Sequence, residues 1–337
     1  MATRVLAGDI GGTKTALAVY RFEETRTARV EAEETFASRE YRGLGEIVHE
    51  FLGTHGEPLA AAAFGIAGAV LAGEVSATNL PWKLSERRLA EEIGSVRVRL
   101  LNDLETTAYA ALFLGPDELH TLNEGVPRQT HRAVIAAGTG LGQAVLFWDG
   151  ARHRPAATEG GHAAFAPRDE REMRLLRFLL ERYPRVSWER VLSGRGLFHI
   201  FEFLRSEGAP VLPVLEKRLA SEDPGAVVGE AGVHGACPTC EDAVNLFVSL
   251  YGAQAANLAL TTMALGGVYV GGGIVTKLLP KVRSGLFMQA FRDAGRFEAL
   301  MRETPVQVIL NPKASLLGAA EFALDLALDT VPKPAST

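Results

Sequence analysis

Cysteine is scarce in this 337-residue chain, which contains only two. Two cysteines cannot build a disulfide framework, so we expect a reducing, cytoplasmic setting. An excess of positive charge is also missing, because 35 Lys and Arg residues stand against 40 Asp and Glu residues, for a formal net charge of −5. Proteins that bind nucleic acid usually carry a basic face. We therefore expect no nucleic-acid partner.

Targeting and membrane segments are not expected either. The apolar run before Asp9 is too short for a signal peptide. Residues 243–276 carry no charge, and a membrane helix needs about 20 mostly apolar residues. This stretch includes polar side chains such as Asn245 and Gln254, and it ends in two glycine clusters. It therefore favours a buried core helix followed by a strand, and no membrane association.

The clearest pattern is an apolar strand, a glycine turn and a second apolar strand. It occurs at residues 5–20 around Gly11-Gly12-Thr13 and again at residues 133–148 around Gly138-Thr139-Gly140. Glycine has no Cβ, so such turns can approach a ligand closely. Two similar hairpins far apart in the chain predict a duplicated architecture with a ligand between the halves. Alternating strand and helix signals in the intervening segments predict an α/β fold.

The first turn has the chemistry of a phosphate site. Backbone N–H groups of Gly11, Gly12 and Thr13 can form an anion-binding concavity beside Lys14. Asp9 at the end of the preceding strand makes chemical sense there if Mg²⁺ lies between it and the phosphates, often through water. The alternative is a plain Asp-Gly hairpin. The chain contains no Gly-Lys dipeptide, which excludes a Walker A motif, and no Rossmann glycine fingerprint follows a strand.

Two further glycine clusters extend this hypothesis. The Gly138-Thr139-Gly140 turn suits a second phosphate, and Gly271-Gly272-Gly273, which follows an apolar strand, suits a flat ring such as adenine or ribose. Each cluster alone is weak evidence, whereas three of them together with Asp9 indicate a nucleotide.

Several polar residues are candidates for chemistry on a second substrate. Asn102-Asp103 falls between a strand and a helix expected over residues 106–114, so Asp103 is either a general base or part of a helix N-cap. Glu159 and His162 flank two glycines, which favours a loop that binds vicinal hydroxyls over a metal site. Glu189 is, on local evidence, an ion-paired or capping-box residue of a helix spanning residues 188–204.

The Cys237-Pro238-Thr239-Cys240 segment has the spacing of a redox or zinc pair. No second pair completes four zinc ligands, and no βαβ context surrounds it. Two thiols in a turn are therefore the favoured interpretation.

These motifs together resemble bacterial ATP-dependent glucokinase over nearly the whole chain. The resemblance rests on six segments in the right order: Gly8-Asp9-Ile10-Gly11-Gly12-Thr13, Leu101-Asn102-Asp103, Gly138 to Gly142, Glu159-Gly160-Gly161-His162, Glu189 to Gly194, and Gly271 to Val275. It implies a two-domain actin-like, or ribonuclease-H-like, sugar kinase fold with an interdomain cleft. The small domain would hold residues 1–112 and 309–329 and the large domain residues 113–308, leaving a frayed tail at 330–337.

The resemblance also implies a function for each motif. The enzyme would phosphorylate the 6-hydroxyl of D-glucose with ATP and Mg²⁺, using Asp103 as the general base. Asn102, Asp103, Glu159, His162 and Glu189 would bind glucose. The residues expected to bind ATP are Gly8, Asp9, Ile10, Gly11, Gly12, Thr13, Gly138, Thr139, Gly140, Gly271, Gly272 and Gly273, with Asp9 reaching Mg²⁺ through water. Glu189 gains its role only from the family match. Relatives are often homodimers, which we expect here too.

Two departures and three alternatives qualify this interpretation. Lys14 stands where relatives often have Asn. The cysteine-rich zinc motif of the related repressor, open-reading-frame, kinase (ROK) family is absent after His162, so no structural zinc is expected. The alternatives are the same chemistry on mannose or N-acetylglucosamine, a sugar-sensing regulator, and an actin-like ATPase. The regulator normally carries an N-terminal DNA-binding segment, and the ATPase has no use for Glu159 and His162.

Overall fold

Two α/β units make up the chain in the computed structural model, which describes residues 2–54, 58–94 and 96–328. Unit 1 comprises Met1–Leu114 and Lys313–Thr337, and unit 2 comprises Gly115–Pro312. The tail expected to fray at residues 330–337 lies outside the described residues.

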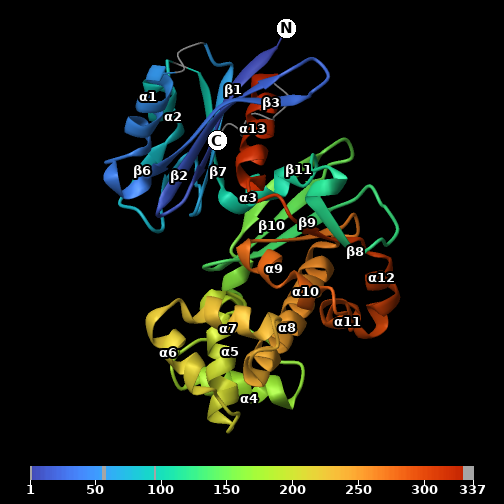
Figure 1. The fold of residues 1–337 in the computed structure, drawn as a ribbon. Helices are drawn as coiled ribbons and strands as arrows, with labels where there is room; N and C mark the ends of the chain where they lie inside the picture. The colour runs from blue at the N-terminus through green and yellow to red at the C-terminus, as the bar shows by residue number, and fades with distance from the viewer. Residues whose placement is uncertain (1, 55–57, 95, 329–337) are drawn as a thin grey trace. The chain divides into compact units, whose positions relative to one another are not determined.

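Unit 1 is built on a five-stranded mixed sheet in the order β3-β2-β1-β4-β7 (Figure 1). Its strands are β1 (Thr3–Ile10), β2 (Lys14–Phe22), β3 (Ala28–Ala37), β4 (Ala61–Ile66) and β7 (Arg97–Asn102). The first three form antiparallel hairpins, whereas β1, β4 and β7 run parallel. A two-stranded ribbon, β5 (Glu74–Ser76) with β6 (Lys83–Ser85), completes the strands described in this unit.

Helices cover both faces of this sheet. On one face, α1 (Leu44–Thr54) and α2 (Glu86–Glu92) contribute apolar residues to a core that also contains Leu6, Leu17 and Phe64. On the other, α3 (Asp103–Ala110) packs on α13 (Ala314–Ala327), which itself lies against β1 and β4. Gly318 allows this close helix contact, because a Cβ there would lie 1.8 Å from the Thr106 carbonyl oxygen. The C-terminal helix is thus an integral part of unit 1.

Unit 2 has a six-stranded sheet in the order β11-β10-β9-β12-β13-β8. Its strands are β8 (Leu119–Asn123), β9 (Arg132–Ala137), β10 (Leu141–Trp148), β11 (His153–Thr158), β12 (Val268–Gly271) and β13 (Val306–Ile309). The hairpins β9–β10 and β10–β11 are antiparallel, and β9, β12 and β13 run parallel. The expected strand–turn–strand repeat is therefore confirmed, and it extends to most of each sheet.

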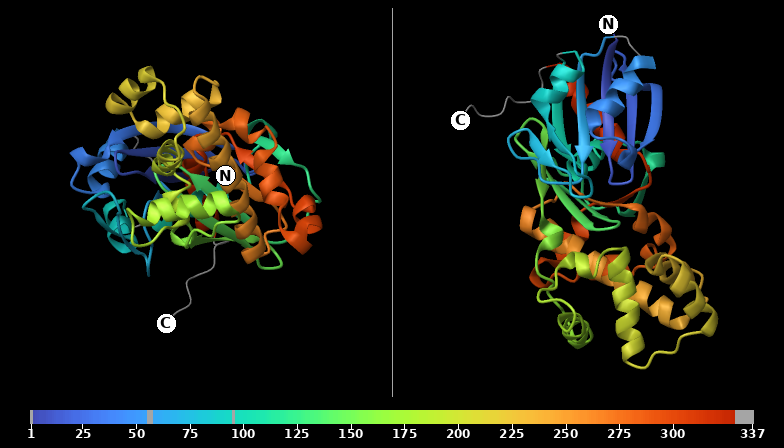
Figure 2. Two further views of the ribbon diagram at one scale, coloured as in Figure 1. Left: turned by 90° about the horizontal axis from the view of Figure 1, so that it is seen from below. Right: turned by 90° about the vertical axis from the view of Figure 1, so that its left-hand side faces the viewer.

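The rest of unit 2 is helical. Figures 1 and 2 show α4 to α7 gathered beside α8, at the end of unit 2 away from the sheet. These helices are α4 (Glu170–Leu180), α5 (Gly194–Ser206), α6 (Pro213–Ser221), α7 (Pro224–Val233), α8 (Pro238–Thr262), α9 (Gly273–Lys277), α10 (Leu279–Val282), α11 (Leu286–Arg292) and α12 (Glu298–Glu303).

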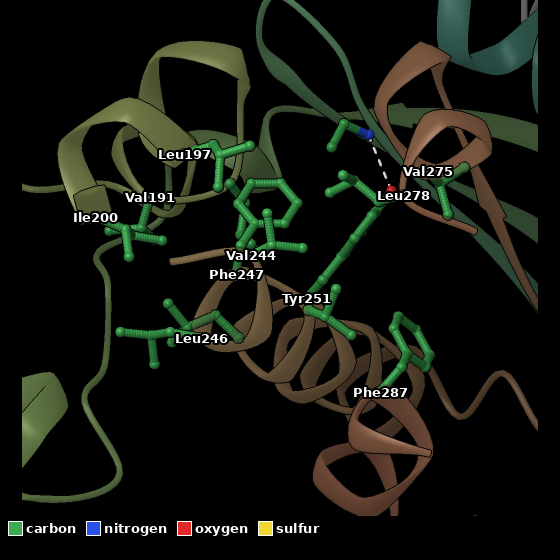
Figure 3. Packing of buried hydrophobic residues seen from close by; sticks show 14 of the residues in the cluster. Val191, Leu197, Ile200, Val244, Leu246, Phe247, Tyr251, Val275, Leu278 and Phe287 are labelled. Atoms are coloured by element: carbon green, nitrogen blue, oxygen red, sulfur yellow. Dashed lines mark hydrogen bonds between the residues drawn. The ribbon is translucent and has the colours of Figure 1, made fainter. Parts of the chain in front are cut away.

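Helix α8 is the uncharged segment considered above for a membrane. Among the described residues it is the one helix long and apolar enough to cross a bilayer, but most of it is buried inside unit 2. Tyr251 in its middle packs with Phe247 and Phe287, and its hydroxyl accepts the Ala137 N–H at 2.9 Å (Figure 3). The expectation of a core helix is confirmed.

Two helix boundaries were predicted wrongly. Helix α3 begins at Asp103, not at residue 106, because the Asn102 side chain caps it. The single helix expected over residues 188–204 is divided into a 3₁₀ turn, η4 (Trp188–Arg190), and helix α5. Ser193 separates them, since its hydroxyl accepts the Gly196 N–H and starts a new helix.

Candidate active site

In unit 1 the acidic candidates lie at one edge of the sheet. Strands β1, β4 and β7 are parallel, so their carboxyl ends meet at the same edge, where ligands of α/β proteins commonly bind. Asp9 pairs with Gly65 of β4, and the next residue of β4, Ile66, pairs with Asn102. The strand pairing therefore places Asp9, Asn102 and Asp103 at the same edge of the sheet.

Asn102 and Asp103 also start helix α3. The Asn102 Oδ1 accepts the Leu104 N–H at 2.9 Å, and the Glu105 carboxylate accepts the Asn102 N–H at 2.8 Å, which forms a capping box. Asn102 Nδ2 donates to the Gly68 carbonyl at 3.1 Å and carries a second N–H. Asp103 is the first helical residue and is half-buried. The Asp103 Oδ1 also accepts the Leu104 N–H at 2.9 Å, so Asp103 shares this capping contact with Asn102.

Asp9 is held by one hydroxyl. Its Oδ1 accepts a hydrogen bond from Ser315 Oγ at 2.9 Å, and Ser315 lies in the first turn of α13. Burial raises the pKa of Asp9, and the Ser315 hydrogen bond lowers it by a smaller amount. A carboxylate whose charge is destabilised by burial gains from a cation placed beside it.

The first glycine turn is tightly folded. Gly11 N–H donates to the Lys14 carbonyl at 2.9 Å, so this amide closes the turn. A Cβ on Gly12 would lie 2.5 Å from Asn79 Cβ, which explains glycine there. In the described part of the chain the amides of Gly12 and Thr13 have no hydrogen-bond partner. Of the three amides predicted to bind an anion, the described part of the chain therefore leaves those of Gly12 and Thr13 for this role.

Other expected residues of this turn are placed as follows. Gly8 and Ile10 are buried in the core of unit 1, Gly8 against the Phe64 ring. Lys14 is exposed at the start of β2, and none of the ion pairs found in the described ranges involves its ammonium group.

In unit 2 the sugar candidates come from two adjoining turns. Glu159 precedes the 3₁₀ turn η3 (Gly160–His162), and Glu189 lies on η4. The turns are joined because Trp188 N–H donates to the Ala163 carbonyl at 3.0 Å and because Ala164 pairs with Ser187 as an isolated bridge. The structure therefore brings Glu159, His162 and Glu189 to one part of the unit.

The glycines explain how the η3 turn packs. A Cβ on Gly161 would lie 1.9 Å from the Leu141 carbonyl oxygen, and one on Gly160 would lie 2.3 Å from Gln143 Oε1. Only glycine lets this turn press on the start of β10. The side chains of Glu159 and His162 are 66% and 58% exposed, with 3.9 Å between His162 Nε2 and a Glu159 carboxylate oxygen. Two exposed polar groups on a fixed turn suit hydroxyl recognition.

The local prediction for Glu189 was wrong. The Ser187 side chain forms no cap, and among the described residues Glu189 forms no ion pair. Instead the Glu189 carboxylate accepts the Leu141 N–H at 3.1 Å and lies against Gly140, where a Cβ would be 2.5 Å from its Oε2. The side chain thus reaches the second glycine turn. No sequence signal within the 187–190 segment indicates this distant contact.

The second glycine turn borders a large groove in unit 2. Gly138 N–H donates to the Gly140 carbonyl, and the Gly138 carbonyl accepts the Gly194 N–H at the start of α5. The groove has a volume of about 1370 Å³ and lies against the N-termini of α5 and α7. Its lining includes Gly138, Thr139, Gly194, Arg195, Pro224, Gly225, Ile274 and Lys277.

The remaining two motifs have clear structural roles. Gly272 has φ +90°, and a Cβ there would lie 2.2 Å from the Ala137 carbonyl, so this glycine is required where β12 leads into α9. Cys237 and Cys240 are buried free thiols at the start of α8, and burial raises the pKa of Cys240. In the ranges that the structure describes, no three His, Cys, Asp or Glu residues form a metal cluster.

Reasoning from the sequence missed other groups near these turns. Ser315 and Thr106, which adjoin Asp9 and Asp103, carried no motif. Gln143 is buried beneath η3, and its Nε2 has no hydrogen-bond partner in the described part of the chain. None of these residues stands in a glycine cluster or an acidic pair, which were the signals used.

Known proteins are similar to this chain over nearly its whole length. A family model described as glucokinase matches residues 6–326. The chain belongs to the glucokinase family. It is 38% identical to the glucokinase of Nostoc punctiforme and 39% identical to that of Synechocystis sp., covering 96% of this chain and 100% and 98% of those relatives. As a member of this family, the protein is an enzyme that phosphorylates glucose with ATP.

Solved structures support the same fold. A glucokinase from an Antarctic psychrotroph is 27% identical and superposes with a TM-score of 0.84 over 96% of this chain and 99% of its own. A ROK family glucokinase from Streptomyces griseus, solved with glucose and AMPPNP, is 21% identical with a TM-score of 0.61 over 96% and 99%. The glucokinase resemblance and the actin-like α/β fold that it implied are confirmed.

Proposed function

We propose that the enzyme transfers the γ-phosphoryl group of ATP to the 6-hydroxyl of D-glucose, with Asp103 as the general base. The single observation that carries this proposal is the placement of Asp9, Asn102 and Asp103 at the carboxyl edge of parallel strands in unit 1. A base must accept the hydroxyl proton as the oxygen–phosphorus bond forms. Its position as the first residue of helix α3 fixes Asp103 in place for this task.

Asn102 and the unit 2 turns are assigned to the sugar. Glu159 and Glu189 supply carboxylates that accept hydrogen bonds. His162 supplies a ring nitrogen that can donate or accept a hydrogen bond, and Asn102 supplies an amide group that can do both. Hydrogen bonds to charged groups are stronger than neutral ones, and a site built around hydroxyls can reject a sugar lacking one by roughly 10⁴-fold. The adjoining positions of η3 and η4 support this assignment.

The unit 2 groove is assigned to ATP. Helix α5 has 13 residues, and its N-terminus lies beside the Gly138 turn, which favours an anionic group. Arg195 and Lys277 line the same groove and would balance phosphate charge. We assign Gly271-Gly272-Gly273 to the nucleoside end, beside the groove residue Ile274.

Asp9 fits a magnesium role. Mg²⁺ bound to a nucleotide commonly takes one or two carboxylates together with phosphates and water, and Asp9 is one half-buried carboxylate beside the unpartnered amides of Gly12 and Thr13. When bound, the ion would neutralise charge on the phosphates. The ATP-binding turn of unit 1 and Asp9 would then serve the same phosphate group.

The test is sugar-dependent ADP production with MgATP across glucose, mannose, fructose, N-acetylglucosamine and a sample without sugar. We expect the strongest signal with glucose and little without sugar, because the binding energy of the correct sugar is what makes the site reactive, so water is a poor acceptor. Activity only with another hexose would show that the proposed substrate is wrong and would leave the proposed mechanism unchanged. Equal ADP production with and without sugar would contradict the proposed sugar kinase and indicate an ATPase instead.

We further propose a cytoplasmic homodimer. The resemblance to homodimeric relatives and the low cysteine content support this. Light scattering coupled to size-exclusion chromatography should give about twice the 36.1 kDa mass of one chain. A mass of one chain at micromolar concentration would contradict it.

A further inference from the structure

Within unit 1, a chain of hydroxyl groups joins Asp9 to the first turn of helix α3, the helix that begins at Asp103. Ser315 Oγ donates to Asp9 Oδ1 at 2.9 Å and lies 2.9 Å from Thr106 Oγ1. Because the single Ser315 hydroxyl proton goes to Asp9, Thr106 Oγ1 is the donor in its contact with Ser315. The Asp103 carbonyl, 2.8 Å from Thr106 Oγ1, then takes its hydroxyl hydrogen bond from Thr107 Oγ1 at 2.9 Å. The chain therefore crosses from β1 through the first turn of α13 to the first turn of α3.

The surrounding packing makes room for these contacts. Gly65 of β4 lies between β1 and β7, and a Cβ there would be 2.6 Å from Thr106 Oγ1 and 3.2 Å from Ser315 Oγ. Thr106 is fully buried. A larger residue at Gly65 would occupy the space in which the two hydroxyl groups meet. Glycine at this position of β4 therefore makes the contact between Thr106 and Ser315 possible.

We propose that Ser315 and Thr106 are positioning residues that hold the Asp9 carboxylate and the Asp103 turn in one hydrogen-bonded arrangement. The inference rests on the proposed roles of Asp9 at the metal-bound phosphate and of Asp103 as the base. Phosphoryl transfer depends chiefly on alignment, so fixing these two groups relative to each other contributes directly to turnover. Groups that orient a metal-linked residue typically matter by about 10- to 100-fold.

Thr107 supplies a matched control. Its Oγ1 donates to the same Asp103 carbonyl at 2.9 Å, but it forms no hydrogen bond to Ser315 in the described ranges. Thr107→Val removes one bond to that carbonyl and leaves the chain to Asp9 intact. In Thr106→Val the carbonyl keeps its bond from Thr107. The two variants thus differ mainly in whether Asp9 remains connected to the first turn of α3.

The experiment measures kcat, glucose KM, the melting temperature and calorimetric binding of AMPPNP with and without Mg²⁺. We expect Ser315→Ala and Thr106→Val to lower kcat by about 10- to 100-fold, with glucose KM changed by less than about threefold. Thr107→Val should stay within about threefold of the parent in kcat, and Thr106→Ser should restore most of the turnover. Ser315→Ala should also reduce the gain in AMPPNP affinity that Mg²⁺ provides.

The melting temperature separates folding from turnover, because the loss of the Ser315 hydrogen bond to Asp9 can also lower stability. A folded Ser315→Ala variant with kcat within about threefold of the parent would overturn the proposal. So would a loss in Thr107→Val equal to that in Thr106→Val.

Asp9→Asn and Asp103→Asn separate this inference from the proposed function. If Ser315 acts through Asp9, Ser315→Ala should cost less than about threefold when added to Asp9→Asn. The same full loss in both backgrounds contradicts the inference alone. Unchanged turnover in Asp9→Asn and Asp103→Asn instead contradicts the proposed roles of those carboxylates.

Discussion

The two sheets have the same strand pattern but carry different chemistry. The order β3-β2-β1-β4-β7 in unit 1 matches β11-β10-β9-β12-β13 in unit 2, with identical parallel and antiparallel pairings. Asp9 stands near the end of β1, whereas the corresponding strand of unit 2, β9, ends at Ala137. Unit 2 carries its acids on the turns η3 and η4. One scaffold thus holds the carboxylates proposed for the chemistry at strand ends in one unit and the groups proposed for sugar binding on turns in the other.

Asp103→Asn, which tests the strand-end carboxylates of unit 1, should produce the largest change in kcat. Loss of a general base costs about 10²- to 10⁴-fold in kcat. The matched control is Asp169→Asn in unit 2, because Asp169 also starts a helix and caps α4 through its side chain. Steady-state assays should show the loss only in Asp103→Asn. Because asparagine caps a helix as well as aspartate does, equal losses in both variants would mean that the effect of Asp103→Asn does not come from the loss of a base.

Gly161→Ala tests the turn architecture of unit 2. A Cβ would lie 1.9 Å from the Leu141 carbonyl, so the η3 turn has to move and take Glu159 and His162 with it. We expect glucose KM to rise by roughly tenfold or more. Gly53→Ala in α1 is the control, since a Cβ there meets nothing within 4 Å. An unchanged KM in Gly161→Ala would show that this turn does not position sugar-binding groups.

Glu189→Gln sharpens the contrast between binding and chemistry. Glutamine can still accept the Leu141 N–H, so the second glycine turn should keep its shape. The lost charge should raise glucose KM by about tenfold while kcat falls much less, since hydrogen bonds to charged groups contribute about 1.5–3 kcal/mol. Initial-rate measurements against glucose separate the two parameters. A fall in kcat with unchanged KM would place Glu189 in the chemistry.

Tyr251→Phe probes how unit 2 supports its glycine turn. The hydroxyl accepts the Ala137 N–H at 2.9 Å and donates toward the Gly271 carbonyl at 3.0 Å, both in the buried core (Figure 3). Removing it leaves a buried amide without a partner, which should cost about 1–3 kcal/mol of unfolding free energy. Urea denaturation measures this. No change in stability would mean that the Ala137 amide finds another partner.

The smallest expected effect is on how the folding stability of unit 2 depends on pH. Burial lowers the pKa of His199, so the folded state favours the neutral ring, and protonation favours the unfolded state. Stability from this residue is present above the ordinary histidine pKa of about 6.5 and is lost as the pH falls below it. His199→Gln should therefore lose less stability than the parent between pH 7 and pH 5.5. An equal loss of stability in both proteins would mean that groups other than His199 cause the sensitivity to acid.

Much of the fold could be predicted from the sequence because glycine turns and apolar runs are local signals. The β1–β2 and β9–β10 hairpins and the core helix α8 were predicted in this way. The boundary at Ser193 was missed because a single serine cap competes with an apolar pattern that continues on both sides. Local propensity is a weak guide where one side-chain hydrogen bond decides the helix start.

The candidate site was less accessible to sequence reasoning. Asp9 and Asp103 stood out because strand ends are common places for reactive groups. Glu189 did not, since its contact is with Leu141, far away in the chain. Ser315 and Thr106 are separated by more than two hundred residues and become neighbours only when α13 packs on α3. Such pairings are products of tertiary structure, and a single sequence carries no local trace of them.

The most direct test of the account is calorimetric glucose binding to Asp103→Asn. If unit 2 supplies most of the sugar recognition and Asp103 the chemistry, the variant should bind glucose within about threefold of the parent Kd despite its loss of turnover. A loss of glucose affinity as large as the loss of kcat would contradict this division, because Asp103 would then be needed mainly to hold the sugar.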